Sequence, residues 1–332
     1  MFCYQCEQTR DAKGCTTIGV CGKTPEVAGL QDILVEACKS VSAYATRAYK
    51  LGAPNDRKLD NWVLGALFST LTNVNFDPGT YIESRTNSDF SIERFSSGFL
   101  SEADAMIKKA KDLYETYAKK AGKPVEDLST RTIPTDKLKV SAINGMSPEQ
   151  YLQYIQNIAS PVGVLAHKSE LSNEDIHSLH ELITYGLKGT AAYAHHAEVL
   201  GQESDEIYRV IIIPLFNLLI SKEFHDLLDF VGSKSKDVGA LLGAAMRVGQ
   251  LNLKVMELLD KGSTEKYGHP VPTNVRTTAV AGKCIAVSGH DLRDLEEILK
   301  QTEGKCINVY THGELLPAHA YPELKVTKSK SM

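Results

Sequence analysis

Apolar side chains recur every three or four positions along most of the chain, from Gly29 to about Val275. This spacing places them on one face of an α-helix, so the pattern predicts a mainly α protein. The expected helices cover residues 30–44, 61–71, 102–121, a segment that starts at 147–149, and then 174–185, 187–200, 204–220, 222–231 and 236–259. The stretches 76–98 and 122–146 lack this period and are expected to be irregular surface connections.

Capping residues mark several helix boundaries. Asp60 is expected to be the N-cap of the helix over 61–71. Ser147 precedes Pro148, which suits the first position of a helix. Gly201 supplies a stop signal after an Ala-rich segment, and we expect that segment to form its own helix from Leu187 onward.

The pattern changes after the turn-rich residues 267–272. Residues 284–288 and 307–310 read as strands, and the segment 292–300 between them reads as an amphipathic helix with Asp291 as its N-cap. A strand, a helix and a second strand in this order form a β-α-β unit, so the two strands should be parallel. Residues 326–332 are polar and are expected to lack regular structure.

These patterns predict an N-terminal helical-bundle domain over 1–275 and an incomplete α/β domain over 276–332. Parallel strands are normally covered by helices on both faces. Only 22 residues follow Tyr310, too few to complete such a domain. Since an incomplete sheet exposes apolar strand edges, we expect poor solubility without a partner.

Composition and charge exclude several classes of protein. The chain has 332 residues and a net charge of −4, which gives no reason to expect nucleic acid as a partner. Mean hydropathy is −0.20, and no stretch approaches the ~20 apolar residues that a membrane span needs. The first residues lack the basic and apolar regions of a secretory signal. We therefore expect a cytoplasmic protein with reduced thiols and no membrane partner.

Four of the seven cysteines lie in the first 21 residues, in the pattern C-x2-C-x8-C-x5-C, at Cys3, Cys6, Cys15 and Cys21. Four thiolates on one short loop form a soft, charge-dense site that suits a thiophilic metal. The spacing favours an iron–sulfur cluster, and structural zinc and unligated thiols are the alternatives. Cys284 and Cys306 lie far away in sequence and are interpreted as small, buried core residues.

A second candidate site is formed by His290 and Glu314, which follow the two predicted strands. The carboxyl ends of parallel strands meet at one edge of a sheet, where open α/β folds hold their ligands. Taken alone, a histidine at a strand end is more often a hydrogen-bonded polar residue than a metal ligand. The pair His195-His196 and the segment 188–193 are interpreted as parts of packed helices rather than as sites.

Several longer motifs together resemble one family. They are MFCYQCEQT at 1–9, GVCGK at 19–23, GLKGTAAYA at 186–194, YGHP at 267–270, SGHDL at 288–292 and NVYTHGE at 308–314. These segments are similar to the hybrid-cluster (prismane) proteins, a family of hydroxylamine reductases, and the similarity runs from residue 1 to about 325. The resemblance implies a helical domain followed by Rossmann-like domains. It also implies a two-electron reduction of hydroxylamine to ammonia and water, with nitric oxide as an alternative small-molecule substrate.

The resemblance assigns ligands as well. Cys3, Cys6, Cys15 and Cys21 match the ligands of the family's cubane 4Fe-4S cluster. His290 and Glu314 match the first two protein ligands of its hybrid 4Fe-2O-2S cluster. That cluster needs further soft ligands, and no cysteine follows Cys306 in this chain.

We therefore expect the N-terminal part of a hydroxylamine reductase-like protein that receives electrons from a donor protein. The hybrid cluster is expected to form only if a C-terminal partner chain supplies the missing ligands. One alternative is a single-cluster electron-transfer or redox and nitric-oxide-stress protein without reductase activity. Another is a helical zinc-binding interaction module.

Overall fold

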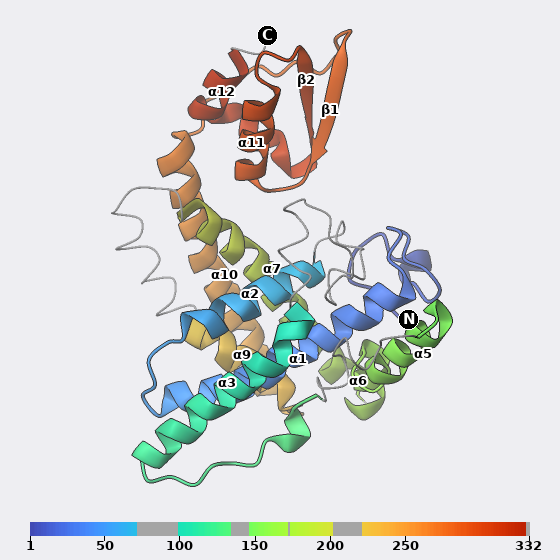
Figure 1. Ribbon diagram of the computed structural model, residues 1–332, viewed down its shortest axis with the longest axis vertical. Helices are drawn as coiled ribbons and strands as arrows, with labels where there is room; N and C mark the ends of the chain where they lie inside the picture. Colours follow the sequence, from blue (N-terminus) through green and yellow to red (C-terminus); the bar gives the residue numbers. More distant parts are fainter. Residues whose placement is uncertain (72–98, 134–145, 172, 202–220, 330–332) are drawn as a thin grey trace. The chain divides into compact units, whose positions relative to one another are not determined.

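The computed structural model describes residues 1–71, 99–133, 146–171, 173–201 and 221–329 (Figure 1). These residues are mainly helical, with one two-stranded parallel sheet, as the sequence predicts. The fold divides into two compact units. The first contains the described parts of residues 1–192 and 215–252, and the second contains those of 193–214 and 253–332.

The first unit is built around the long helix α1 (Pro25–Lys50). Thr24 caps this helix by accepting a hydrogen bond from the Val27 N–H at 3.3 Å, and Pro25 occupies its first turn. Most α1 side chains are buried, because helices pack around it on several sides. These neighbours are α2 (Arg57–Leu71), α3 (Phe99–Lys120), α5 (Pro148–Ala159) and α9 (Ser221–Gly232).

Further helices are α6 (Val164–Leu171), α7 (Glu174–Gly201) and α10 (Val238–Tyr267), and short 3-10 helices are η1 (Arg10–Ala12) and η3 (Ser129–Arg131). Ser147 forms a capping box with Gln150 at the start of α5, which confirms that predicted boundary.

The predicted helix over 204–220 and the predicted connection over 76–98 lie outside the described residues. Among the described residues, no helix has both the length and the apolar character that crossing a bilayer requires.

Helix α7 is continuous, so the prediction of separate helices over 174–185 and 187–200 is wrong. Gly186, which stands between the two predicted segments, lies inside the helix. A Cβ atom at this position would lie only 2.8 Å from the Val248 Cγ1 atom of α10. The glycine therefore allows close helix packing and does not end the helix.

Asp60 is not the N-cap of α2, which corrects a second prediction. The helix begins at Arg57, and the Asp56 carboxylate accepts hydrogen bonds from the N–H groups of Lys58 and Leu59 at 3.0 and 3.2 Å. Asp60 lies one turn further along and is 1% exposed. Its Oδ1 atom accepts hydrogen bonds from the Tyr49 hydroxyl and from His225.

The second unit contains the predicted β-α-β arrangement. Strands β1 (Lys283–Ser288) and β2 (Ile307–His312) are parallel, with helix α11 (Leu292–Thr302) between them in sequence. The Asp291 carboxylate accepts from the N–H groups of Arg293 and Asp294 and is the N-cap of α11, as predicted. The chain then forms the 3-10 helix η7 (Gly313–Ala320) and α12 (Pro322–Ser329). Residues 326–329 are therefore helical, and the prediction that they lack regular structure is wrong.

Only one face of the sheet is well covered by the described residues. Leu295 and Leu299 of α11 belong to a buried cluster, against which Val287 and Val309 pack from the strands. Cys284 projects to the opposite face of β1 and is exposed, and Cys306 before β2 is exposed as well. The prediction that both thiols are buried in a core is therefore wrong, because no packed layer covers that face among the residues described.

Candidate metal centre

The N-terminal loop pairs two of its four cysteines through the backbone. The Cys3 N–H donates to the Cys15 carbonyl at 3.0 Å, and the Cys15 N–H donates back to the Cys3 carbonyl at 2.8 Å. This exchange of two hydrogen bonds is that of an antiparallel bridge. It holds the first and third cysteines side by side although eleven residues separate them in sequence.

The surroundings of Cys15 favour its thiolate form. Hydrogen bonds from the backbone N–H groups of Arg10 and Val20 lower the pKa of this thiol, and the Thr9 hydroxyl contributes in the same direction. The Thr9 Oγ1 and Cys15 Sγ atoms are 3.9 Å apart. Since the thiolate is the form that binds metal, these donors prepare Cys15 to act as a ligand.

The four cysteines differ in exposure. Cys15 is buried, Cys3 and Cys6 are half-buried, and Cys21 is exposed. Within the described part of the chain, no three or more His, Cys, Asp or Glu side chains form a group that could hold a metal ion. The structure therefore brings Cys3 and Cys15 together without gathering all four sulfur atoms. The donor set itself, with four thiols and N–H groups directed at sulfur, has the chemistry of an iron–sulfur site.

Two lysines that the sequence did not single out as site residues lie beside the loop. Lys23 is buried, and its Nζ atom lies 3.9 Å from Cys3 Sγ and 2.6 Å from Gln31 Oε1. Lys188 is also buried and donates a hydrogen bond of 2.6 Å to Gln5 Oε1. Lysines are rarely fully buried. A lysine among small apolar residues, as in the segment 188–193, was therefore the sequence feature that could have indicated a buried positive charge.

Gln5 connects the loop to two helices. Its Oε1 atom accepts the hydrogen bond from Lys188 of α7. Its Nε2 atom donates to the carbonyl oxygens of Thr70 and Leu71, both at 3.1 Å. These carbonyls belong to the last turn of α2, where the helix leaves its acceptors without internal partners. One amide side chain therefore anchors the cysteine loop to α2 and α7.

The strand ends place His290 and Glu314 at one edge of the sheet. The last paired residues are Ser288 and His312, an offset of 24 positions, and His290 and Glu314 keep the same offset two residues further on. The φ angle of Gly313 is +61°, which turns the chain from β2 into η7, where Glu314 lies. Both side chains are exposed. The edge is thus shared, as expected, but no third ligand joins the pair among the described residues.

Comparison with known proteins decides the family. The family described as Prismane/CO dehydrogenase matches residues 1–331. The chain belongs to this family. The resemblance found in the sequence motifs is therefore confirmed.

Three relatives named hydroxylamine reductase are similar to this chain. Those from Maridesulfovibrio salexigens and Syntrophobacter fumaroxidans are 42% identical over 325 residues, and that from Geobacter sulfurreducens is 40% identical over 326 residues. The alignments cover 98% of this chain but 50%, 51% and 52% of the three relatives. The chain thus spans about half the length of the curated relatives it matches.

Other histidines of this prismane-family chain have local partners. His196 Nδ1 lies 3.3 Å from the Asp291 carboxylate, the N-cap of α11. The rings of His195 and His196 are 6.4 Å apart between centroids. At the sheet edge, His312 Nδ1 contacts Ser288 Oγ at 3.0 Å, and His319 Nε2 contacts Thr311 Oγ1 at 2.7 Å. These contacts give each of these histidines a role in local packing and hydrogen bonding.

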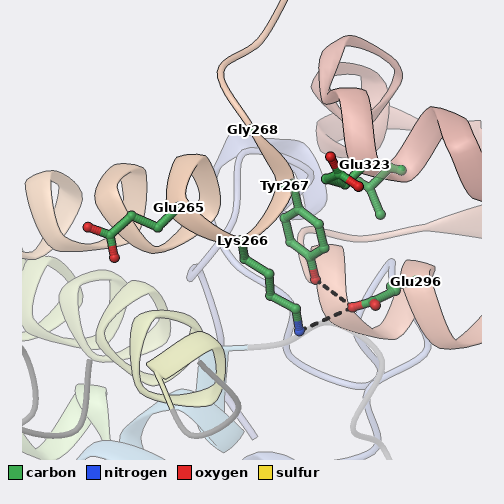
Figure 2. A pocket seen from close by; sticks show the side chains of 7 residues that line it. Glu265, Lys266, Tyr267, Gly268, Glu296 and Glu323 are labelled. Atoms are coloured by element: carbon green, nitrogen blue, oxygen red, sulfur yellow. Dashed lines mark hydrogen bonds and ion pairs between the residues drawn. The ribbon is translucent and has the colours of Figure 1, made fainter. Parts of the chain in front are cut away.

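An open pocket of about 470 Å³ lies in the second unit (Figure 2). Glu296 lies on one side of it, where it accepts a hydrogen bond from the Tyr267 hydroxyl at 3.0 Å and pairs with Lys266 at 3.1 Å. None of the lining residues is a predicted ligand. They are Glu265, Lys266, Tyr267, Gly268, Glu296, Glu323 and Leu324.

Proposed function

We propose that this chain is the N-terminal part of a hydroxylamine reductase-like iron–sulfur protein. Cys3, Cys6, Cys15 and Cys21 would hold a 4Fe-4S cluster. The observation that carries the proposal is the backbone pairing of Cys3 with Cys15, in a chain that matches the prismane family along almost its whole length. It is supported by the N–H donors that favour the Cys15 thiolate.

The proposed role of the cluster is to accept one electron at a time from a donor protein and pass it on. The reaction named for the relatives consumes two electrons and two protons, converting hydroxylamine to ammonia and water. The chain's own residues hold the loop in place. Gln5 binds it to α2 and α7, and Thr9 contacts both cysteines of the bridge, since its hydroxyl donates to the Cys3 carbonyl at 3.1 Å.

His290 and Glu314 would contribute an imidazole nitrogen and a carboxylate oxygen to the family's hybrid cluster. Their shared sheet edge supports this assignment, because each residue follows the carboxyl end of one of the two parallel strands. Two ligands of this kind do not hold a multi-iron sulfide cluster, which needs several soft donors. Reduction of hydroxylamine would therefore require further soft ligands besides His290 and Glu314.

Anaerobic reconstitution of the purified chain with iron and sulfide tests the proposal. We expect about four irons per chain, one cubane-type EPR signal on reduction, and little or no hydroxylamine turnover. Absence of bound iron after strictly oxygen-free handling would refute the cluster assignment. Stoichiometric zinc in a colourless protein would support the zinc-binding alternative instead.

A single-cluster electron-transfer protein is the second candidate function. The exposure of His290 and Glu314, with no third ligand near them in the described chain, favours it for the chain on its own. This candidate predicts reversible one-electron reduction without turnover even when a partner chain is added. Robust hydroxylamine turnover, or iron well above four per chain with a second spin system, would count against it.

A further inference from the structure

Two positive charges are buried beside the cysteine loop. Lys23 and Lys188 expose only 3% and 5% of their surface to solvent. Burying an ammonium group is costly unless a negative charge or several hydrogen-bond acceptors compensate it. Each lysine instead donates a hydrogen bond of 2.6 Å to a neutral amide oxygen, Lys23 to Gln31 Oε1 and Lys188 to Gln5 Oε1.

The carboxylate that acts most strongly on Lys188 is Asp32 of α1. Asp32 is buried, and burial raises its pKa to about 7, although Lys188 and Lys23 both oppose that shift. A carboxyl group with this pKa is only about half ionised near neutral pH, so it does not neutralise two lysines. Burial lowers the pKa of Lys188 to about 8, so this group still carries most of its charge at neutral pH. Glu181 of α7 also attracts Lys188, but Asp32 and Glu181 together do not offset the burial of this ammonium group, because its pKa stays lowered.

The cysteine sulfur atoms of the loop can supply negative charge close to these lysines. Lys23 Nζ lies 3.9 Å from Cys3 Sγ, and Lys188 is held through Gln5, which stands between Cys3 and Cys6 in the sequence. Four thiolates on the loop would supply the anionic group that these lysines face. Reduction of a cluster bound there adds one more negative charge, which a nearby buried cation stabilises.

We propose that Lys23 and Lys188 provide the counter-charge of the four-cysteine centre and thereby raise its midpoint reduction potential. The inference rests on the proposed function, because it needs a redox centre at the four cysteines. It goes further by assigning to two residues outside the ligand set the control of how readily that centre accepts an electron. The two lysines act on the centre through their positive charge and do not bind the metal.

A redox titration followed by EPR on the anaerobically reconstituted chain tests this inference. The variants are Lys188→Met, which removes the charge, and Lys188→Arg, which keeps it. Lys13→Met is the matched control, because Lys13 is an exposed lysine of the same loop and solvent screens its charge. Iron per chain is measured first for every variant.

We expect Lys188→Met to lower the midpoint potential enough to reduce the ratio of reduced to oxidised cluster about tenfold at a fixed potential, a shift of about 59 mV. Lys188→Arg should restore most of this loss, and Lys13→Met should leave the potential close to that of the unchanged chain. Equal potentials for the unchanged chain and Lys188→Met would overturn the inference while leaving the cluster assignment intact. An unchanged chain that binds no iron would overturn both.

Lys23→Met provides a second test that does not alter α7. A lower potential in this variant supports the inference. If both methionine variants keep native circular dichroism but fail to load iron while Lys188→Arg loads, the counter-charge role is also supported. If Lys188→Arg fails to load as well, the charge is not what matters and the inference is overturned.

Discussion

His225 Nε2 lies 3.0 Å from Asp60 Oδ1, and the two side chains are only 1% and 0% exposed. The other ring nitrogen of His225 contacts the Ser42 hydroxyl at 2.8 Å, so one imidazole joins α9 to α2 and to α1. This polar network lies within the otherwise apolar packing around α1. Breaking it should cost far more than breaking an ion pair at the surface.

His225→Leu should therefore lower the free energy of unfolding by about 3–5 kcal/mol, because it leaves the buried Asp60 carboxyl group without its imidazole partner. Denaturant unfolding measures this loss. Glu174→Gln is the matched control, because it breaks the exposed 2.8 Å pair with Lys168 and should cost less than about 1 kcal/mol. Similar losses of unfolding free energy in the two variants would show that the buried network stabilises the fold no more than an exposed ion pair does.

His195 should make the fold less stable in mild acid. Burial lowers the pKa of this imidazole to about 4, the neighbouring His196 acts in the same direction, and Asp291 opposes them. In the unfolded chain the pKa is about 6.5. As the pH falls from 6.5 towards 4, the unfolded state therefore binds a proton that the folded state does not, and stability decreases.

Thermal melting between pH 7 and pH 4 tests this expectation. His195→Phe removes the titrating group and should flatten the decrease of the melting temperature over that window. The buried histidine His180 has the same direction of pKa shift from burial and provides a comparison. Parallel melting curves for the unchanged chain and His195→Phe would contradict the assignment of this pH dependence to His195.

Replacing a proposed ligand should abolish cluster binding without unfolding the protein. We expect Cys15→Ser to lose most of the roughly four irons per chain, because it removes the thiolate that the backbone donors stabilise. Cys284→Ser is the matched control, since Cys284 is exposed on β1 and is not a proposed ligand. Iron and sulfide analysis separates the two, and equal iron contents would exclude Cys15 as a ligand.

The outer edge of β1 should promote self-association. Ile285 lies on this edge strand and is 38% exposed, and exposed apolar strands tend to pair with other chains. Ile285→Lys should increase the monomer fraction in size-exclusion chromatography with light scattering. Leu316→Lys, at a position 65% exposed on η7, makes the same change outside a strand and should have a smaller effect. An equal gain from both variants would indicate general apolar exposure rather than strand pairing.

The elements that the sequence predicted correctly depend on local patterns. Periodic apolar positions gave α1 and α3, and capping residues gave the starts of α5 and α11. The parallel pairing of β1 with β2 followed from the strand-helix-strand order, since the crossover rule leaves few other topologies. In each case the information lies within a short stretch of sequence.

The predictions that failed depend on contacts between distant segments. Asp60 carries a good capping side chain, but its partners Tyr49 and His225 come from two other helices. The two helices predicted on either side of Gly186 form one helix, and the role of this glycine is explained only by the close approach of Val248. Cys284 has the residue type of a core position, but the layer that would cover it is missing from the described chain. The roles of Lys23 and Lys188 likewise follow only from their neighbours in space.

The anchoring of Gln5 to the last carbonyls of α2 has a consequence for substitutions far from any sulfur. The loop does not have to be ordered by the incoming metal alone, because the bundle has already restricted its conformations. A change that loosens the final turn of α2 should therefore weaken metal retention although no residue of that helix is a ligand. A substitution that loosens the helical bundle would then be detected first as a loss of the visible absorption of the bound cluster, before any loss of helix content.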